Sequence, residues 1–347
     1  MVVYIFMIVS CLVTQYICDH TKRYKKIWGL LPITIIFFIS ALRYNVGTDY
    51  SGTYLGSYYK IMRGIDTNLE FVPTLFFKLI VKLGLDSQWF FVITSFIFCY
   101  FLYMCISDQA TNKMLSYFIA ICGAFLFFAY NGIRQAMAMI IFYYSLKWII
   151  YNENNLRYWT DNVIAVGCHS SAAVFLPFNL FLKRRFKIKS KVALIAIAFV
   201  LSKVAVPFIV SIIIKTKYIF YINNAEMFSK SSLNLSNYIN ILFLFLYEYI
   251  LFRNKDITAQ DIVYDNIHFI GVIVSLFVLS IPLTYRLFYA FRYIEFLSVP
   301  NLLRHCSKKY RKLVTILVYV FYFGYFVYMI LIQHSHDSLP YMTVFDR

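Results

Sequence analysis

The sequence contains few charged residues: Lys, Arg, Asp and Glu together make up 14% of its 347 positions. A soluble domain carries about 25%, so this chain cannot cover a globular surface with polar side chains. Hydrophobic residues fill 61% of the positions and recur in long runs along the whole chain. The composition excludes a soluble module and predicts a single integral-membrane domain over residues 1–347.

Acidic residues are scarcer than basic ones, 16 against 33, which gives a net charge of +17. The basic residues gather in short loops between apolar runs, in 22–26, 183–191 and 304–312. This is the positive-inside pattern, which sets the orientation of a membrane protein. The charge therefore indicates topology, and we expect no nucleic-acid partner.

Patterns that bind metals or form disulfides are missing as well. The seven cysteines lie mostly inside apolar runs, without a CxxC pair or regular spacing. They predict neither a zinc site nor a disulfide framework. No DxD-like pair suggests a divalent cation, and we expect no metal and no cofactor. The first run, Val2 to Ile17, lacks a basic segment before it and a cleavage site after it, so we expect it to remain as a span.

The apolar runs predict an all-α fold, a polytopic bundle of about 10–12 transmembrane helices, some of them broken or re-entrant. A weaker run, 71–85, contains Pro73, Lys78 and Lys82. The stronger runs fall at 2–18, 28–42, 89–106, 115–130, 136–151, 162–182, 192–214, 236–252, 268–284, 286–303 and 313–332.

The basic loops predict the orientation. If 19–27 is cytoplasmic, then the N-terminus, the polar stretch 43–70, the segment 215–235 and the tail 333–347 are external. The side of Asn131 depends on the weak run 71–85. If that run spans, Asn131 lies on the cytoplasmic side.

If the run is instead re-entrant or interfacial, Asn131 lies outside with 43–70. The run 162–182 must then break near His169 or Pro177 to keep 183–191 inside. We favour this second arrangement because it gathers the polar motifs on one face.

The first polar motif follows the second apolar run and consists of Arg43, Gly47-Thr48-Asp49-Tyr50 and Tyr54. The glycine makes the backbone flexible, the tyrosine rings suit sugar faces, and Asp49 can accept a proton from a hydroxyl. Two simpler interpretations stay open. Arg43 can anchor a helix end by reaching lipid headgroups, and the glycine-containing stretch can be a plain external turn.

The second motif is Asn131, Arg134 and Gln135, between two apolar runs with no other charge nearby. Inserting a charged side chain near the membrane core costs about 2.5–3.5 kcal/mol on insertion scales. Such residues therefore usually face a cavity and bind a substrate or an ion. The guanidinium suits phosphate oxygens, and the two amides add neutral donors. The alternative is a cap and turn between two hairpin helices. We favour a functional role.

The third motif is His169, in the sequence Gly-Cys-His-Ser-Ser inside an apolar run. A satisfied structural histidine is one interpretation, but the cost of an unpaired polar group in a membrane favours a partner or a pathway. Nothing nearby supplies a second metal ligand, so a zinc site is not predicted.

The fourth motif contains Arg286 and Arg292. Arg292 and Glu295 are three residues apart and can pair along one helix face. Arg286 is then the unpaired cation at the outer end, which either holds a phosphate or anchors the helix at the interface.

Together these motifs resemble the EpsG-type family of Wzy-like polysaccharide polymerases. The resemblance runs from Arg43 to about Pro300 and rests on the first motif, on Asn131 with Arg134, Gln135 and Ala138, on His169-Ser170-Ser171-Ala172, and on Arg286 with Tyr289.

The resemblance implies a membrane glycosyltransferase of the bacterial inner (plasma) membrane. It would join oligosaccharide repeat units on undecaprenyl pyrophosphate into O-antigen or exopolysaccharide, with 43–70 and 215–235 as periplasmic loops. The lipid-linked donor and acceptor, membrane lipids and a chain-length regulator would be its partners. Arginines would neutralise the leaving pyrophosphate. Asp49 or His169 would take the proton of the acceptor hydroxyl.

The sequence is also compatible with three rival functions. A flippase or transporter for the same lipid-linked sugars would also use intramembrane arginines, but it tends toward internal pseudo-symmetry, and no repeat is visible here. An O-antigen ligase would perform the same bond-forming chemistry on a different acceptor. A non-catalytic membrane scaffold is opposed mainly by the isolated Arg134.

Overall fold

The computed structural model describes residues 1–152, 154–204, 208, 211, 233–254, 256–281 and 284–346. These residues form helices and turns without a β-strand, which confirms the predicted all-α class. The chain divides into two compact units. Unit 1 comprises Met1–Phe178 and Glu295–Arg347, and unit 2 comprises Asn179–Ile294.

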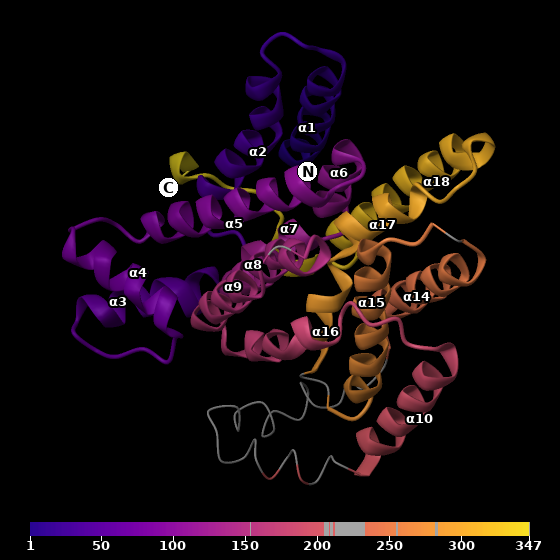
Figure 1. The fold of residues 1–347 in the computed structure, drawn as a ribbon. Helices are drawn as coiled ribbons and strands as arrows, with labels where there is room; N and C mark the ends of the chain where they lie inside the picture. The colour runs from indigo at the N-terminus through magenta and orange to yellow at the C-terminus, as the bar shows by residue number, and fades with distance from the viewer. Residues whose placement is uncertain are drawn as a thin grey trace. The chain divides into compact units, whose positions relative to one another are not determined.

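Unit 1 begins with a helical hairpin, in which α1 and α2 lie side by side (Figure 1). Helix α2 also packs on α5, and α5 packs on α8. The helices of unit 1 are α1 (Val2–His20), α2 (Lys25–Ala41), α3 (Gly56–Met62), α4 (Phe71–Lys82), α5 (Gln88–Gln109), α6 (Lys113–Cys122), α7 (Phe125–Asn131), α8 (Ile133–Ile150), α9 (Asn155–Cys168), α17 (Glu295–Leu303) and α18 (Lys308–Val327).

Helix α8 forms the centre of unit 1. Every one of its residues except Arg134 and Tyr144 is buried, as expected for a helix that is apolar on all sides. It packs against α5, α7 and α9. Because the site motif Arg134-Gln135 lies in its first turn, that motif is held by a helix that is almost entirely enclosed.

The apolar run 162–182 is not one helix. Helix α9 ends at Cys168, His169 adopts an extended backbone, and the 3₁₀-helical segment Ser170–Leu180 follows. The chain therefore breaks at His169, one of the two positions that the sequence analysis indicated. The side chain of His169 is placed at a helix end, where it can face polar groups.

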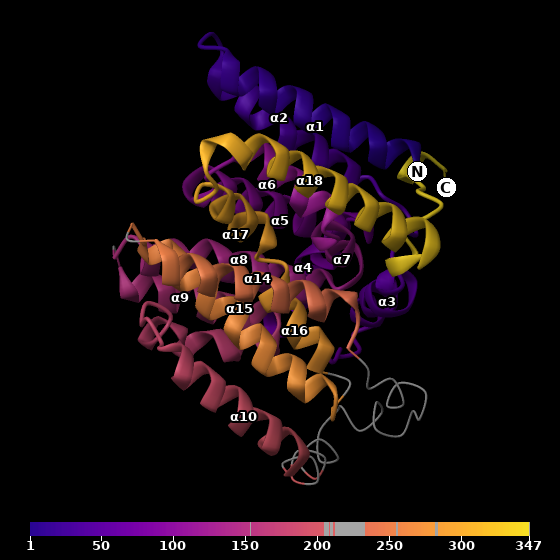
Figure 2. The same ribbon diagram turned by 90° about the vertical axis from the view of Figure 1, so that its right-hand side faces the viewer.

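Unit 2 packs around α15, which contacts α10, α14 and α16. In Figure 2, α14 and α15 lie side by side. Both helices begin with a capping box, formed by Asn234 with Asn237 and by Thr258 with Asp261, which satisfies backbone N–H groups at each start. The helices are α10 (Ile188–Val204), α14 (Leu235–Arg253), α15 (Ala259–Val278) and α16 (Thr284–Arg292).

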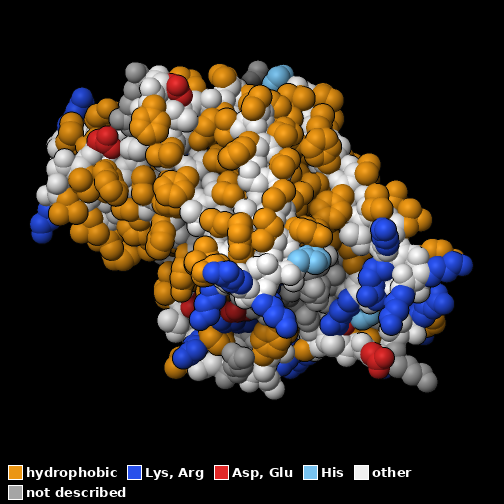
Figure 3. Space-filling view, turned by 90° about the horizontal axis from the view of Figure 1, so that it is seen from above, with side chains coloured by type: hydrophobic (Ala, Val, Ile, Leu, Met, Phe, Trp, Pro, Cys, Tyr) orange, Lys and Arg blue, Asp and Glu red, His pale blue; other side chains and the backbone are white. Residues whose placement is uncertain are grey.

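Several helices are suited to a bilayer by length and composition. In the described residues, α1, α5, α14, α15 and the continuous stretch Lys308–Ile332 can cross a membrane. Helices α6 and α7, bent by 47° at their junction, can add a sixth span. On the face in Figure 3, hydrophobic side chains form broad areas, while Lys and Arg gather in separate patches. The chain is a multi-pass membrane protein.

The predicted count of ten to twelve spans is not reached among the described residues. The run 286–303 is divided between α16 and α17, and the run 162–182 breaks at His169. Helix α4, from the weak run 71–85, has 12 residues and is ~18 Å long, too short to cross a hydrocarbon core of ~30 Å. The single-domain assignment and the two external loops stay predictions, and 215–232 lies outside the described residues.

Candidate active site

The first motif turns back on the end of α7 through Gly47. Gly47 has φ +106°, a conformation that L-residues rarely adopt. A Cβ added to it would lie 2.7 Å from the carbonyl oxygen of Tyr130. Glycine is therefore required for this close approach, which brings Thr48 and Asp49 onto Asn131.

Asn131 ties the first two motifs together. Its side-chain Oδ1 accepts hydrogen bonds from the Thr48 hydroxyl and from the backbone N–H of Asp49, the latter at 2.9 Å. Its carbonyl oxygen accepts a hydrogen bond from the Tyr54 hydroxyl at 3.2 Å. The two motifs thus lie on the same side of unit 1, as the favoured arrangement requires.

The C-terminal tail lies across the same turn. The backbone N–H of Tyr44 donates to the carbonyl of Met342 at 2.9 Å, and that of Gly47 donates to the carbonyl of Asp337 at 3.3 Å. His336 Nδ1 lies 3.5 Å from the amide nitrogen of Asn131. The tail therefore packs against both the first motif and Asn131.

Glu70, a residue that the sequence analysis did not single out, lies between Arg134 and His169. One carboxylate oxygen accepts a hydrogen bond from Arg134 Nη1 and the other lies 2.9 Å from His169 Nδ1. Glu70 immediately precedes α4, Arg134 lies in the first turn of α8, and His169 follows α9. Three helix ends thus converge on one cluster, which we call the Glu70 cluster.

The Glu70 cluster is largely enclosed. The side chain of Glu70 is 8% exposed, that of His169 17% and that of Arg134 20%. Burial alone would raise the pKa of Glu70, but the hydrogen bond to His169 and the charge of Arg134 outweigh it and lower the pKa to about 2. Glu70 is therefore a carboxylate at neutral pH.

An ionised carboxylate can only accept hydrogen bonds, so His169 must carry its proton on Nδ1. The lone pair of a neutral His169 is then on Nε2, which is the arrangement that turns an imidazole into a general base. Arg134 adds a positive charge next to that base. Its Nε is buried and has no hydrogen-bond partner among the described residues.

Tyr50 and Tyr54 are packed as core residues. Tyr50 stacks on Phe91 with ring centroids 4.2 Å apart, and Tyr54 stacks on Phe90 at 5.2 Å. Both tyrosines are 1% exposed. The stacked phenylalanine rings cover the ring faces of both tyrosines in this conformation. We therefore assign the two tyrosines a structural role, which is to fix the turn that carries Asp49.

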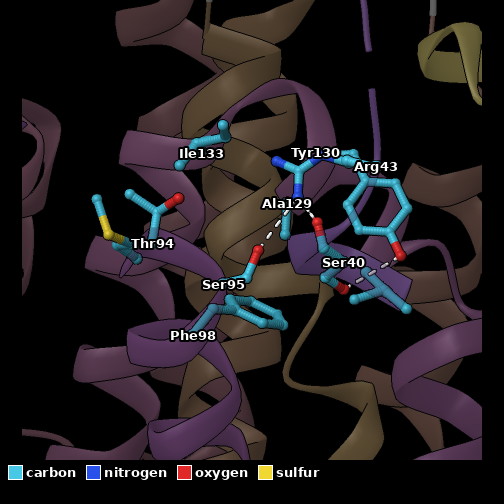
Figure 4. Close-up of a pocket in the computed structure, with 10 residues that line it drawn as sticks. Ser40, Arg43, Thr94, Ser95, Phe98, Ala129, Tyr130 and Ile133 are labelled. Carbon is cyan, nitrogen blue, oxygen red and sulfur yellow. Dashed lines mark hydrogen bonds between the residues drawn. The ribbon is translucent and has the colours of Figure 1, made fainter. Parts of the chain in front are cut away.

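Arg43 is buried and does not reach outward as a headgroup anchor would. It is 1% exposed, and its Nη1 donates to the carbonyl of Ser40 and to the hydroxyl of Ser95, the latter at 3.2 Å (Figure 4). Its guanidinium lies over the rings of Phe91 and Tyr130, 5.2 and 4.7 Å from their centroids. The cavity beside it measures about 10 Å³, room for one water at most.

The remaining predicted site residues differ in location. Gln135 is buried beside Arg134 at the start of α8. Arg286 and Arg292 belong to unit 2, whereas the other eight predicted residues belong to unit 1. Arg286 is exposed and donates to the Tyr285 hydroxyl at 3.2 Å. Arg292 is 1% exposed, with its guanidinium 5.3 Å from the Tyr293 ring centroid.

Arg292 and Glu295 do not lie on one continuous helix. Arg292 is the last residue of α16 and Glu295 the first residue of α17, with a turn between them. Glu295 accepts a hydrogen bond from the Tyr322 hydroxyl at 2.7 Å. The continuous helix expected over these two residues is therefore interrupted, while their pairing stays a prediction.

Of the two residues that were missed, Glu70 and His336, only Glu70 had a signal in the sequence. Glu70 is an acidic residue directly before an apolar segment, where a helix N-terminus favours negative charge. His336 sits in a tail with no regular spacing, so no pattern pointed to it. In the described residues, no group of three or more His, Cys, Asp and Glu side chains is arranged for a metal ion.

The comparison with protein families agrees with the motif pattern. The family model described as the EpsG family matches residues 26–343. No curated protein and no solved structure is detectably similar to the chain. The match covers the Glu70 cluster, both polar motifs around Asn131 and most of the tail. The chain belongs to the EpsG family.

Proposed function

We propose that this protein is a polysaccharide polymerase of the inner membrane. It joins polyprenyl-pyrophosphate-linked oligosaccharide repeat units into O-antigen or exopolysaccharide at the periplasmic face. Membership of the EpsG family supports a role in polysaccharide biosynthesis. The observation that carries the catalytic part of the proposal is the contact of Glu70 with both His169 and Arg134.

In the proposed reaction, His169 Nε2 takes the proton of the acceptor sugar hydroxyl. The hydroxyl oxygen then attacks the anomeric carbon of the donor, and the bond from that carbon to the pyrophosphate oxygen breaks. The bonding electrons leave with the pyrophosphate. Glu70 stabilises the imidazolium that forms, which makes it a positioning residue in the manner of a carboxylate behind a catalytic histidine.

Arg134 is proposed to stabilise the negative charge that develops on the leaving pyrophosphate. Its guanidinium is tied to Glu70 through Nη1, so it is oriented before substrate binds. A donor fixed in this way needs no reorganisation during the reaction. Gln135 and Asn131 are the neutral neighbours that we propose to orient the substrate.

Asp49 is the second candidate for the base. Its backbone N–H is fixed on Asn131, and its side chain is half-buried on the turn that Gly47 makes. We favour His169, because an imidazole held through Nδ1 has its base nitrogen defined. We propose that Arg43, which is enclosed by Ser40, Ser95 and two aromatic rings, positions the first motif and does not hold pyrophosphate itself.

The experiment is the electrophoretic pattern of surface polysaccharide from cells that lack this protein and carry variants of it. A polymerase deletion leaves single repeat units attached, whereas a ligase deletion removes all surface-linked polymer. Arg134→Ala is expected to reproduce the polymerase deletion. Full-length polymer from Arg134→Ala and Arg43→Ala variants, both shown to be inserted normally, would overturn the proposal.

A further inference from the structure

Unit 2 contains a groove of about 680 Å³ that the proposed reaction does not use. One wall is the segment that leads into α10 and carries Arg185 and Lys187. The opposite wall is the second half of α14, with Phe245, Tyr249 and Phe252. We call these the basic wall and the aromatic wall.

The basic wall belongs to a segment of concentrated positive charge. Residues 183–191 contain six Lys or Arg and no acidic residue. Arg185 and Lys187 are both exposed, and Arg185 donates a hydrogen bond to the carbonyl of Leu251 near the end of α14. That bond holds the guanidinium beside the end of α14, so that the positive charge lines the groove. Such a wall attracts phosphate oxygens.

The aromatic wall is a stripe along one face of α14. Phe245, Tyr249 and Phe252 are spaced four and three residues apart and are 68%, 54% and 91% exposed. Because α14 is apolar and long enough to cross a membrane, this face is suited to acyl chains. Cations beside an apolar stripe at a helix end match a lipid with a negatively charged headgroup.

An ion cluster fixes the two walls relative to each other within unit 2. Lys191 of α10 lies 2.6 Å from Glu248 of α14 and also contacts Asp265 of α15. Lys191 and Asp265 are buried. Glu248 lines the groove, but its charge is engaged by Lys191, so Arg185 and Lys187 are left to define what the groove attracts.

We propose that this groove binds an anionic phospholipid of the surrounding bilayer. The phosphate would sit on the basic wall and one acyl chain would run along the aromatic wall. A soluble polyanion would contact only the basic wall, and a zwitterionic lipid would be held only by the aromatic wall. This site is independent of the proposed polymerase reaction, because none of its residues belongs to the Glu70 cluster.

The test uses the full-length protein purified in detergent, with phosphatidylglycerol, phosphatidylcholine or inorganic phosphate added. Native mass spectrometry counts the retained lipids, and thermal unfolding measures stabilisation. The wild type is expected to retain phosphatidylglycerol in preference to phosphatidylcholine and to be stabilised by it. The double variant Arg185→Gln/Lys187→Gln is expected to bind phosphatidylglycerol at least ~10-fold more weakly.

The matched control is Lys22→Gln/Lys25→Gln, which removes the same charge from exposed residues of another basic segment. It is expected to bind phosphatidylglycerol like the wild type. If the Arg185 variant does not fold, Lys187→Gln and Phe252→Ala provide the test, because both side chains are exposed. Equal retention of both lipids, an equal effect of inorganic phosphate, or unchanged binding by these variants would overturn the proposal.

Discussion

His169 Nδ1 and a carboxylate oxygen of Glu70 lie 2.9 Å apart, although 99 residues separate them in sequence. Arg134 holds the other oxygen of the same carboxylate. The carboxylate therefore fixes the tautomer of the histidine and the direction of the guanidinium at once. If this relationship is catalytic, each of its members has a distinct and measurable role.

Glu70→Gln is expected to lower polymer formation by up to ~10⁴-fold, the effect of replacing the carboxylate behind a catalytic histidine by an amide. An amide can still accept from Nδ1 but does not stabilise an imidazolium. The measurement is polymer formed per amount of inserted protein, with Glu70→Asp as a partial rescue. Asp66→Asn is the matched control because Asp66 is an exposed acid of the same loop. Equal losses in the two variants would argue against a specific role for Glu70.

The stability of the protein should depend on pH through Glu70. Its pKa is about 2 in the folded protein against an ordinary value of 4.5, so the ionised form is favoured by folding. This stabilisation is fully present above about pH 4.5 and is lost as the pH falls toward 2. The melting temperature of wild type minus that of Glu70→Gln is therefore expected to shrink between pH 6 and pH 3. A constant difference over that range would contradict the assignment.

Gly47→Ala is expected to destabilise the protein by about 2 kcal/mol or more, since a positive φ costs an L-residue of order 1–3 kcal/mol and the new Cβ meets the Tyr130 carbonyl. Thermal unfolding in detergent measures the effect. Gly52→Ala is the control, because nothing lies within 4 Å of a Cβ there. A wild-type melting temperature for Gly47→Ala would mean that the turn is not held against Asn131.

Arg43 and Arg134 should respond differently to the same change to lysine. Arg43→Lys loses buried hydrogen bonds to Ser40 and Ser95, and is expected to lower stability by about 1–3 kcal/mol. Arg134→Lys keeps a charge beside Glu70 but loses the planar fork, and is expected to lower turnover at a near wild-type melting temperature. The two readouts are unfolding and polymer formed per folded protein. A loss of turnover without a loss of stability in Arg43→Lys, or the opposite in Arg134→Lys, would contradict a structural role for Arg43 and a catalytic role for Arg134.

The C-terminal tail should be required for the site and dispensable for the helices. Truncation after Gln333 removes the backbone contacts of Asp337 and Met342 with the first motif. We expect unchanged helix content by circular dichroism and a loss of polymer formation. Truncation after Val344 leaves these contacts in place and is expected to remain active. Full activity of the shorter chain would show that the tail does not support the site.

Much of the architecture follows from local patterns in the sequence. Composition alone defined the all-α membrane class, because apolar runs leave no other way to satisfy backbone polar groups in a bilayer. The polar residues around His169 marked the break in 162–182. The division of 286–303 between α16 and α17 had no such mark, since no glycine or proline stands at residues 293–294.

The site was predictable only in part, because its contacts are long-range. Periodicity indicates which residues share a helix face and says nothing about which loops meet. Asn131 meets Thr48 across 83 residues, and Glu70 meets His169 across 99. Arg43 had the sequence signature of an interfacial anchor, and only its packing against Ser95 and Tyr130 shows that it is buried.

The most direct test of the central claim uses the purified protein in vesicles with a polyprenyl-pyrophosphate-linked repeat unit. Gel electrophoresis would follow chain growth while released polyprenyl pyrophosphate is measured in parallel. The wild type is predicted to form a ladder of lipid-linked oligomers and to release one polyprenyl pyrophosphate for each bond formed, and His169→Ala is predicted to do neither. A folded wild type that moves the substrate across the bilayer without joining units, or an unchanged ladder from His169→Ala, would contradict the account.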